Sequence, residues 1–231
     1  MKKIAINQTI YLPWKGYFDL INSVDVFVFL DTVQYTEHDW RNRNKILTHQ
    51  GSKWITVPIK NSCRRGQLIC EAEIDNRSTW QRKHYNAFKL NYSKAPYFNE
   101  FEWIIEELFM NKSWNKISEF NISAIKLIAK ILGIKTEFID SLDLNPEGAK
   151  DDRVIDIIKK LNGDYYLSGP RASEYLIPEK FENNNIKLEY INYDYPDYKQ
   201  VFEPFDHFVT VLDLIFNCGE AAPYYIWGWR N

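Results

Sequence analysis

The fold is decided by residues 3–44, which read KIAINQTIYLPWKGYFDLINSVDVFVFLDTVQYTEHDWRNRN. Residues 3–6 and 26–30 are continuous apolar runs, and residues 16–21 between them carry apolar side chains at helical spacing. Strands that are apolar throughout, rather than alternating with polar residues, are typical of a parallel sheet covered on both faces. A strand, a helix and a second strand within about thirty residues predict a right-handed crossover unit.

Polar residues follow both predicted strands. Asn7 and Gln8 come directly after the first strand, and Asp31, Gln34 and Tyr35 come after the second. The carboxyl ends of parallel strands meet at one edge of a sheet, and ligands of open α/β folds bind there. We therefore expect these side chains to stand together and to mark a ligand site.

The rest of the chain alternates between helical and extended patterns. It predicts a hairpin over residues 45–57, strands over 68–74, 136–139, 165–167 and 186–193, and helices over 80–91, 98–109, 117–132, 154–161, 172–176 and 208–216. This alternation predicts an α/β fold: a mostly parallel sheet flanked by helices, with Rossmann-like layering and a more helical middle segment. Because the chain has no repeat and no low-complexity linker, we expect a single domain over residues 1–231.

Composition narrows the class of protein. A net charge of −2 gives no global attraction to nucleic acid or to an anionic membrane. No apolar run approaches the roughly 20 residues of a membrane-spanning helix, and the first residues form no secretory signal. The cysteines, Cys63, Cys70 and Cys218, are too scattered for a disulfide framework, and the four histidines include no i, i+4 pair, so no metal site is expected. We expect a cytoplasmic protein, with no membrane insertion and no nucleic-acid partner, whose aromatic tail at residues 223–229 packs down or forms a homodimer contact.

A polar and aromatic loop follows the second strand at residues 36–44. Arg41 and Arg43 project the same way if the loop is extended, and guanidinium groups suit phosphate or carboxylate oxygens. Trp40 beside them could stack on a base or cap an arginine. The alternative is a solvated surface loop with one packed Trp. Aromatic residues are 16% of the chain, which fits either a site for a flat ligand or an aromatic-rich core.

Weaker signals lie further along the chain. Ser168 and Gly169 fall between a predicted strand and a helix, where an anion-binding turn can form, although the spacing is not that of a phosphate-binding loop. His84 lies on the apolar face of its helix, in line with Trp80, and a histidine there is more often a core residue than a ligand-binding one. Asp213 lies on another apolar face and needs an Arg, a Lys or a backbone cap as its partner.

Residues 7–18, NQTIYLPWKGYF, resemble the opening motif of the WbqC-like family. That family also has an acidic residue and a Val-Gln pair after the second strand, matched by residues 31–34, then a Trp-x-Asn-Arg-Asn loop, matched by residues 40–44, and a Trp-x-x-Val-Pro strand, matched by residues 54–58. Further blocks match at His84, Tyr92, Pro96, residues 166–169, Tyr198, Gln200 and residues 212–219. The resemblance covers nearly the whole chain, and one departure is Thr9, where the family more often has Pro.

The resemblance implies a role in surface-polysaccharide (O-antigen) biosynthesis and suggests, as a hypothesis, acyl or aminoacyl transfer to the amine of a nucleotide-linked aminosugar. Arg41 and Arg43 would then hold the pyrophosphate, and Asp31 or His84 would take the proton of the attacking amine. The base would stack on Trp14, Trp40 or Tyr35, and the remaining substrate-binding candidates are Asn7, Gln8, Tyr11, Gln34, Asn42, Ser168, Gly169, Tyr198 and Gln200. The expected partner is a nucleotide sugar, and the acyl donor, for instance an acyl thioester, stays open.

Other functions also stay open. A non-catalytic module would bind a sugar or nucleotide through the abundant Trp and Tyr side chains. The layout of residues 3–30 also resembles that of H-x-G-H nucleotidyltransferases, but Trp14 and Tyr17 stand at or near the histidine positions, which does not favour ATP chemistry. A thiol enzyme would need Cys218 beside His207, and eleven residues of helix would separate them by about 16 Å.

Overall fold

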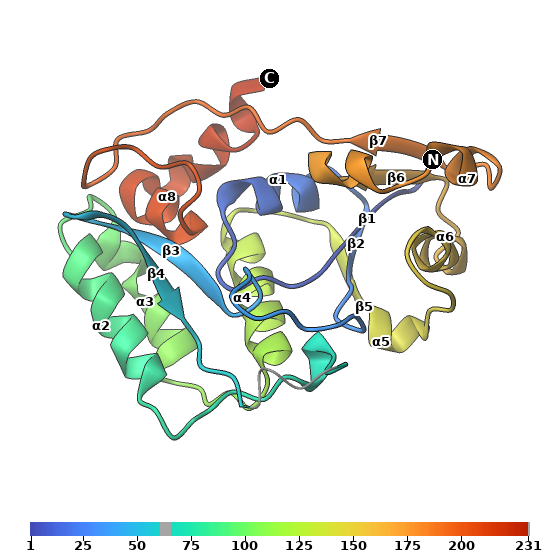
Figure 1. The fold of residues 1–231 in the computed structure, drawn as a ribbon. Coiled ribbons are helices and arrows are strands. Elements are labelled where there is room, and N and C mark those ends of the chain that lie inside the picture. Colours follow the sequence, from blue (N-terminus) through green and yellow to red (C-terminus); the bar gives the residue numbers. More distant parts are fainter. Residues whose placement is uncertain (61–65, 231) are drawn as a thin grey trace.

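Five parallel strands form the central sheet of the structure, a computed structural model that describes residues 1–60 and 66–230 (Figure 1). The strands are β1 (Lys3–Asn7), β2 (Val26–Phe29), β5 (Glu137–Asp140), β6 (Tyr165–Ser168) and β7 (Lys187–Tyr190), in the order β5-β2-β1-β6-β7. The expected α/β fold with a parallel sheet is confirmed. The chain moves outward from β1 through β2 and β5, and it then returns to the other side of β1 through β6 and β7. A reversal of this kind opens a ligand crevice between the two central strands. Cys63 lies outside the described residues.

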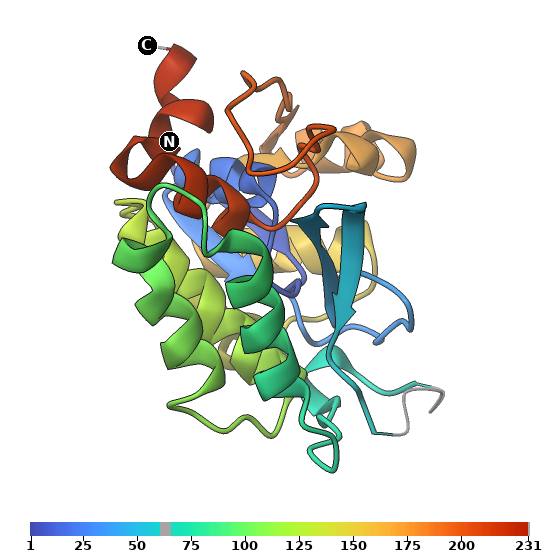
Figure 2. The same cartoon turned by 90° about the vertical axis from the view of Figure 1, so that its left-hand side faces the viewer.

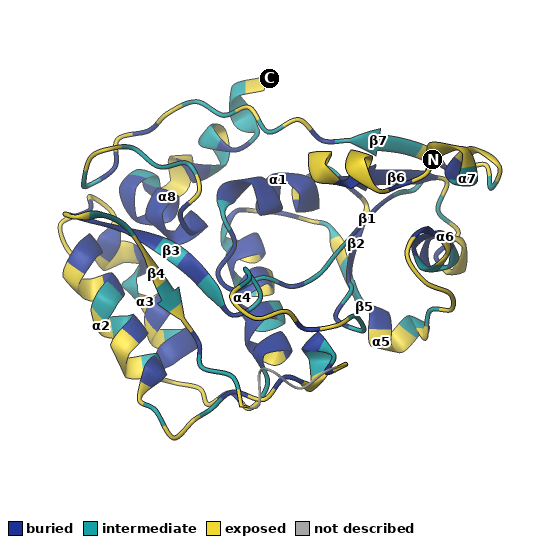
Figure 3. Ribbon diagram, viewed as in Figure 1, coloured by how far each residue is buried: buried dark blue, intermediate teal, exposed yellow. Residues whose placement is uncertain are grey.

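Both faces of the sheet are covered, as the continuous apolar strands predict. Val26 and Val28 point into one apolar core, and Phe27 and Phe29 point into the other, because successive side chains of a strand face opposite ways. The Phe side is covered by α1 (Lys15–Asn22) and α4 (Ile117–Ile131), and the Val side by α6 (Asp151–Lys160) and α7 (Pro178–Glu182), with the short α5 (Ser141–Leu144) following β5. α1 is buried along almost its whole length (Figure 3).

The middle of the chain is helical, as expected. α2 (Trp80–Tyr92) and α3 (Phe98–Phe109) pack in the same core as α4, and α8 (Val211–Cys218) joins them from the end of the chain. An antiparallel hairpin of β3 (Arg43–Thr48) and β4 (Gly51–Thr56) stands apart from the central sheet (Figure 2). Among the helices of the described residues, none has the length and apolar character needed to cross a lipid bilayer.

The strand predicted over residues 68–74 is wrong. The segment forms a 3₁₀ turn, η1 (Ile69–Glu71), between two isolated bridges that join Leu68 to Gln34 and Ile74 to Ile59. The turn closes because the Glu71 carboxylate accepts a hydrogen bond from the backbone N–H of Leu68 at 3.2 Å. The alternation of apolar and polar residues over 68–74 therefore reflects a turn with alternately buried side chains, and not a strand hydrogen-bonded along its length.

Three other boundaries also differ. Residues 172–176 do not form an α-helix, because the 3₁₀ turn η2 (Pro170–Glu174) begins at the proline. The strand predicted over 186–193 ends at Tyr190. The helix predicted from residue 208 begins at Val211, since the Thr210 hydroxyl caps it by accepting from the N–H of Leu212 at 3.4 Å.

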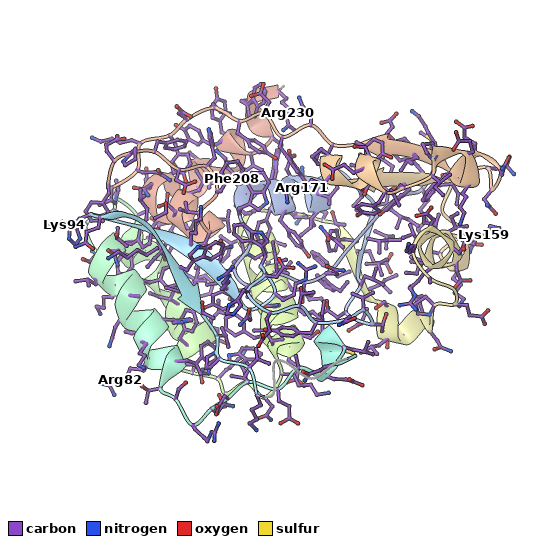
Figure 4. All side chains as sticks on the ribbon, viewed as in Figure 1. Arg82, Lys94, Lys159, Arg171, Phe208 and Arg230 are labelled. Carbon is purple, nitrogen blue, oxygen red and sulfur yellow. The ribbon has the colours of Figure 1, made fainter. Side chains whose placement is uncertain are left out.

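The aromatic tail forms the 3₁₀ turns η3 (Gly219–Tyr225), which packs against α8 of its own chain, and η4 (Gly228–Arg230), which is tied to α1. Arg230, labelled in Figure 4, donates two hydrogen bonds to the Asp19 carboxylate, at 3.1 and 2.7 Å, and Tyr195 donates another at 2.8 Å. Asp19 is fully buried, so these donors compensate a charge that would otherwise destabilise the fold. The homodimer contact stays a prediction.

Candidate functional site

A cavity of about 650 Å³, here called the aromatic cavity, opens where the sheet order reverses. Asn7 at the end of β1 and Ser168 at the end of β6 both line it, as the rule for parallel sheets predicts. Its walls are the rings of Trp14, Tyr17, Trp40, Tyr166, Tyr175, Tyr193, Tyr195, His207 and Phe208, the cations Arg41 and Arg171, and Ile6, Asn7, Ile10, Ser168, Gly169, Pro170, Ala172 and Asp194. Figure 4 labels Arg171, from η2, and Phe208, from the segment before α8.

The loop between β1 and α1 holds Trp14 in the wall of this cavity. Leu12 adopts a left-handed backbone conformation with φ 42°, and the Asn44 side chain stabilises it by donating to the carbonyl of Leu12 at 2.7 Å. The Trp14 indole then packs edge-on against Tyr193, with ring centres 5.0 Å apart. Gly16 is required here, because a Cβ at this position would lie 2.3 Å from the indole.

Arg41 supplies a cation to the aromatic cavity, as the sequence predicts. Its guanidinium pairs with Asp39 at 3.1 Å, while its Nε is buried and has no hydrogen-bond partner among the described residues. Arg171 also lines this cavity, and it follows Ser168 and Gly169 of the predicted anion-binding turn in the chain. Two guanidinium groups and a hydroxyl around one space are suited to an anion such as a diphosphate.

Asp31 lies beneath the loop and away from the cavities. Its carboxylate is fully buried and accepts from the N–H of Thr9 at 2.9 Å, from the Thr9 hydroxyl at 2.7 Å and from the Ser118 hydroxyl. Burial raises the pKa of Asp31, and these hydrogen bonds oppose that shift. The Thr9 that departs from the family pattern therefore has a partner, and Asp31 fastens the loop that carries Trp14.

His84 is also buried, in the helical core. Its Nδ1 lies 2.7 Å from the Tyr11 hydroxyl, and its ring meets those of Trp80 and Phe109 edge-on. Burial lowers the pKa of His84 to about 4, so the imidazole is neutral at pH 7. Neither His84 nor Tyr11 lines the aromatic cavity or the second cavity described below.

Another imidazole, that of His207, lines the aromatic cavity and is paired with an acid. It belongs to the connecting segment, residues 191–210, which follows β7 without regular structure. The Nε2 of His207 lies 3.0 Å from an Asp197 oxygen, and the other ring nitrogen, Nδ1, is buried and has no hydrogen-bond partner among residues 1–60 and 66–230. Partial burial, and then the charge of Lys15, lower the pKa of His207, which favours the neutral base. From the sequence alone, His207 is a candidate only as a partner of Cys218.

Lys15 anchors the connecting segment to α1, and no sequence signal identified it. Its ammonium group lies 5.0 Å from the ring centre of Tyr195, 5.1 Å from that of Tyr198 and 5.9 Å from that of Phe205. Burial lowers the pKa of Lys15 to about 8, although the charge of Asp197 opposes the shift. A cation is attracted by the faces of the rings that enclose it. Lys15 and its three rings, here called the Lys15 box, therefore hold the connecting segment against α1.

Two predicted substrate contacts belong instead to a buried network around Asp213. Tyr198 donates to one Asp213 oxygen at 2.7 Å, and Gln200 donates to the same oxygen at 2.9 Å. The predicted partner, an Arg, a Lys or a backbone cap, is wrong, because neutral donors surround the carboxyl group. Burial raises the pKa of Asp213 to about 6.

A further cavity of about 740 Å³, here called the aliphatic cavity, lies against the first. Its lining is Ile6, Asn7, Gln8, Leu30, Thr32, Val33, Gln34, Leu68, Ala149, Lys150, Asp151, Arg153, Val154, Tyr166, Tyr175 and Leu176. Ile6, Asn7, Tyr166 and Tyr175 also line the aromatic cavity, so they form a wall common to both.

The predicted residues thus divide into two groups. Those that line a cavity are Asn7, Gln8, Trp14, Gln34, Trp40, Arg41, Ser168 and Gly169. Those that line neither are Tyr11, Asp31, Tyr35, Asn42, Arg43, His84, Tyr198 and Gln200. Of the side chains expected to stand together at the strand ends, Gln8 and Gln34 line the same cavity and Asp31 does not. Arg43 packs 4.3 Å from the ring centre of Trp54 on the hairpin.

Among the described residues, no group of three or more His, Cys, Asp and Glu side chains is arranged to hold a metal ion.

Comparison with known proteins agrees with the sequence motifs. A family model described as the WbqC-like protein family matches residues 8–225. A protein of Mycobacterium tuberculosis (strain ATCC 25618 / H37Rv), named "Uncharacterized protein Rv1507c", is 39% identical over 227 residues, which cover 98% of each chain. No solved structure matches this chain. The chain therefore belongs to the WbqC-like protein family.

Proposed function

We propose that this protein is a cytoplasmic transferase that binds a nucleotide-linked aminosugar in the aromatic cavity and adds an acyl or aminoacyl group to the sugar amine for surface-polysaccharide (O-antigen) biosynthesis. The observation that carries the proposal is one cavity, at the reversal of the sheet, that combines stacking rings with two arginines. Its volume of about 650 Å³ is within the usual range for small-molecule sites.

Each part of the ligand has a matching part of the wall. Indole and phenol rings stack on a nucleobase, and guanidinium groups hold a diphosphate. Arg41 supports the second role because its buried Nε still lacks an acceptor among the described residues. Asn7, at the end of β1, offers an amide to the sugar hydroxyls.

His207 replaces Asp31 and His84 as our proposed base, because those two line neither cavity. With Nε2–H donated to Asp197, the buried Nδ1 keeps a lone pair that no described residue occupies, and in our proposal this lone pair accepts the proton of the amine. The amine nitrogen forms a bond to the carbonyl carbon of the donor, the bond from that carbon to the leaving group breaks, and the proton passes to His207.

Calorimetry with UDP- and dTDP-linked aminosugars tests the binding step. We expect binding that weakens by about tenfold in Arg41→Ala and in Arg171→Ala, the cost of one charged hydrogen-bonding group. Arg82→Ala, at an exposed position of α2, is the matched control and keeps the affinity. Binding that is absent for every nucleotide sugar, or unchanged in both cavity variants, would contradict the proposal.

A non-catalytic binding protein is the second candidate, and the burial of Asp31 and His84 favours it. Both candidates predict binding, and only the transferase predicts a gain of mass on the aminosugar. Incubation with acyl donors followed by mass spectrometry separates them. Nucleotidyl transfer receives no support from the residues at the start of α1, where Trp14 and Tyr17 line the cavity.

A further inference from the structure

The aliphatic cavity is not used by the nucleotide sugar in the function proposed above. It is as large as the aromatic cavity, at about 740 Å³, and it opens at the same edge of the sheet. Asn7 and Tyr166, from the neighbouring strands β1 and β6, belong to both linings. A molecule in each cavity would therefore be separated only by the side chains of this common wall.

The two linings differ in chemistry. Outside the common wall, the aliphatic cavity has no aromatic ring to stack on a base. It offers an aliphatic surface from Leu30, Val33 and Leu176, and amides from Gln8 and Gln34. A lining of this kind fits a short acyl chain with hydrogen-bonding groups better than a second nucleobase.

Arg153 gives the aliphatic cavity a fixed cation. Its Nε donates to the carbonyl of Gly148 at 3.0 Å, and its Nη1 donates to the carbonyl of Thr32 at 3.1 Å. These bonds tie the guanidinium of α6 to the segment that follows β2. Its other donors have no acceptor among the described residues, so they remain available to a ligand.

Lys150 adds a second cation to the same lining. The nearby carboxylate of Asp151 is buried and accepts from the N–H of Ile177 at 3.3 Å, and Asp152 is paired with Lys180 at 2.7 Å. Asp152 is thus engaged by Lys180, whereas Asp151 lines the cavity. Two cations, Arg153 and Lys150, against the one carboxylate of Asp151 leave the lining with an excess of one positive charge.

We infer that the aliphatic cavity is the acyl-donor site and that the donor carries a phosphate group, which Arg153 and Lys150 bind while the acyl chain lies on the aliphatic surface. This inference rests on the proposed function. The acyl carbon would meet the sugar amine where the two cavities adjoin, beside Asn7 and Tyr166 and not through them. The new N–C bond forms as the bond from the acyl carbon to the leaving group breaks, the leaving group departs as an anion, and His207 receives the amine proton.

Two donor classes share this phosphate chemistry: acyl phosphates, and thioesters of phosphopantetheine. Titration with acetyl phosphate and with acetyl phosphopantetheine, followed by protein NMR or calorimetry, distinguishes them. We expect one of the two to bind, and its affinity to fall about tenfold in Arg153→Ala and in Lys150→Ala. Lys150 has an exposed side chain, so its variant keeps the inference testable if Arg153→Ala is unstable.

Two matched variants complete the design. Lys159→Ala removes a cation from the exposed side of the same helix and leaves donor binding unchanged. Arg171→Ala weakens nucleotide-sugar binding and leaves donor binding unchanged. Absence of binding by both phosphate donors, or equal binding in Arg153→Ala, Lys150→Ala and the unmodified protein, would overturn the inference.

The two proposals can fail separately. Donor binding that depends on Arg153, without binding of any nucleotide sugar, would reject the proposed acceptor and support this cavity assignment. Nucleotide-sugar binding that depends on Arg171, with donor binding that also depends on Arg171 and not on Arg153, would support the acceptor and reject the second cavity as the donor site.

Discussion

An acid and an imidazole occur in two regions of this molecule, and the regions use them differently. In the buried region, the Asp31 carboxylate is engaged by Thr9 and Ser118, and His84 is engaged by Tyr11. In the connecting segment, the Asp197–His207 pair lies at a cavity, and one imidazole nitrogen has no partner among the described residues. Our proposed base is therefore chosen by the unused hydrogen-bonding capacity of its ring, and not by a position at a strand end or on a motif.

The largest expected effect is on the rate of turnover, and it concerns the imidazole of His207. In His207→Ala, we expect the rate of acyl transfer to fall by about 10²–10⁴, the usual contribution of a general base, with nucleotide-sugar affinity unchanged. Single-turnover mass measurements give the rate. His49→Ala, at an exposed position of the hairpin, is the control. A transferase that keeps its full rate without His207 would remove the distinction between the regions.

The next effect separates the two acids by stability. Asp31→Ala removes the acceptor of three buried donors, so we expect the free energy of unfolding to fall by about 4 kcal/mol. Asp197 is 75% exposed, and Asp197→Ala should change that free energy by less than about 0.5 kcal/mol. Urea unfolding measures both. Equal losses in the two variants would contradict the contrast.

The smallest effect concerns the pH dependence of stability. Burial lowers the pKa of His84 from 6.5 to about 4, so the unfolded chain binds a proton more readily than the folded one between those values. Stability should therefore be fully present above pH 6.5 and fall by up to about 3 kcal/mol on acidification to pH 4. His84→Phe should lose this component, and a curve parallel to that of the unmodified protein would show that the imidazole is not buried in its neutral form.

The sequence predicts the layers of the fold because they depend on local patterns. Residues 98–109 are helical as predicted. The single apolar run that contains Val26 and Phe27 forms a strand that is buried on both faces. The position of the aromatic cavity also follows from sequence, because Asn7, at the carboxyl end of β1, lines it.

The other half of the site depends on information that local patterns lack. Ser168 lies at the same edge of the sheet as Asn7 because β6 pairs with β1. The order of the strands cannot be predicted from the periodicity of the sequence. Arg171, Arg153 and His207 enter the cavities from segments without a recognisable motif. Asp31 was placed at the correct edge, but its side chain turns inward to Thr9, and the direction of a side chain after a strand depends on the packing around it.

The bond between Arg230 and Asp19 joins positions 211 residues apart in the chain. Closing so long a loop costs more conformational entropy than a local contact, so we expect this tie to form after the local helices. Together with the Lys15 box, it fixes the wall that carries Trp14 and Tyr195. The pocket should accordingly be a late-assembling unit that opens by sub-global unfolding while the strands stay protected from hydrogen exchange.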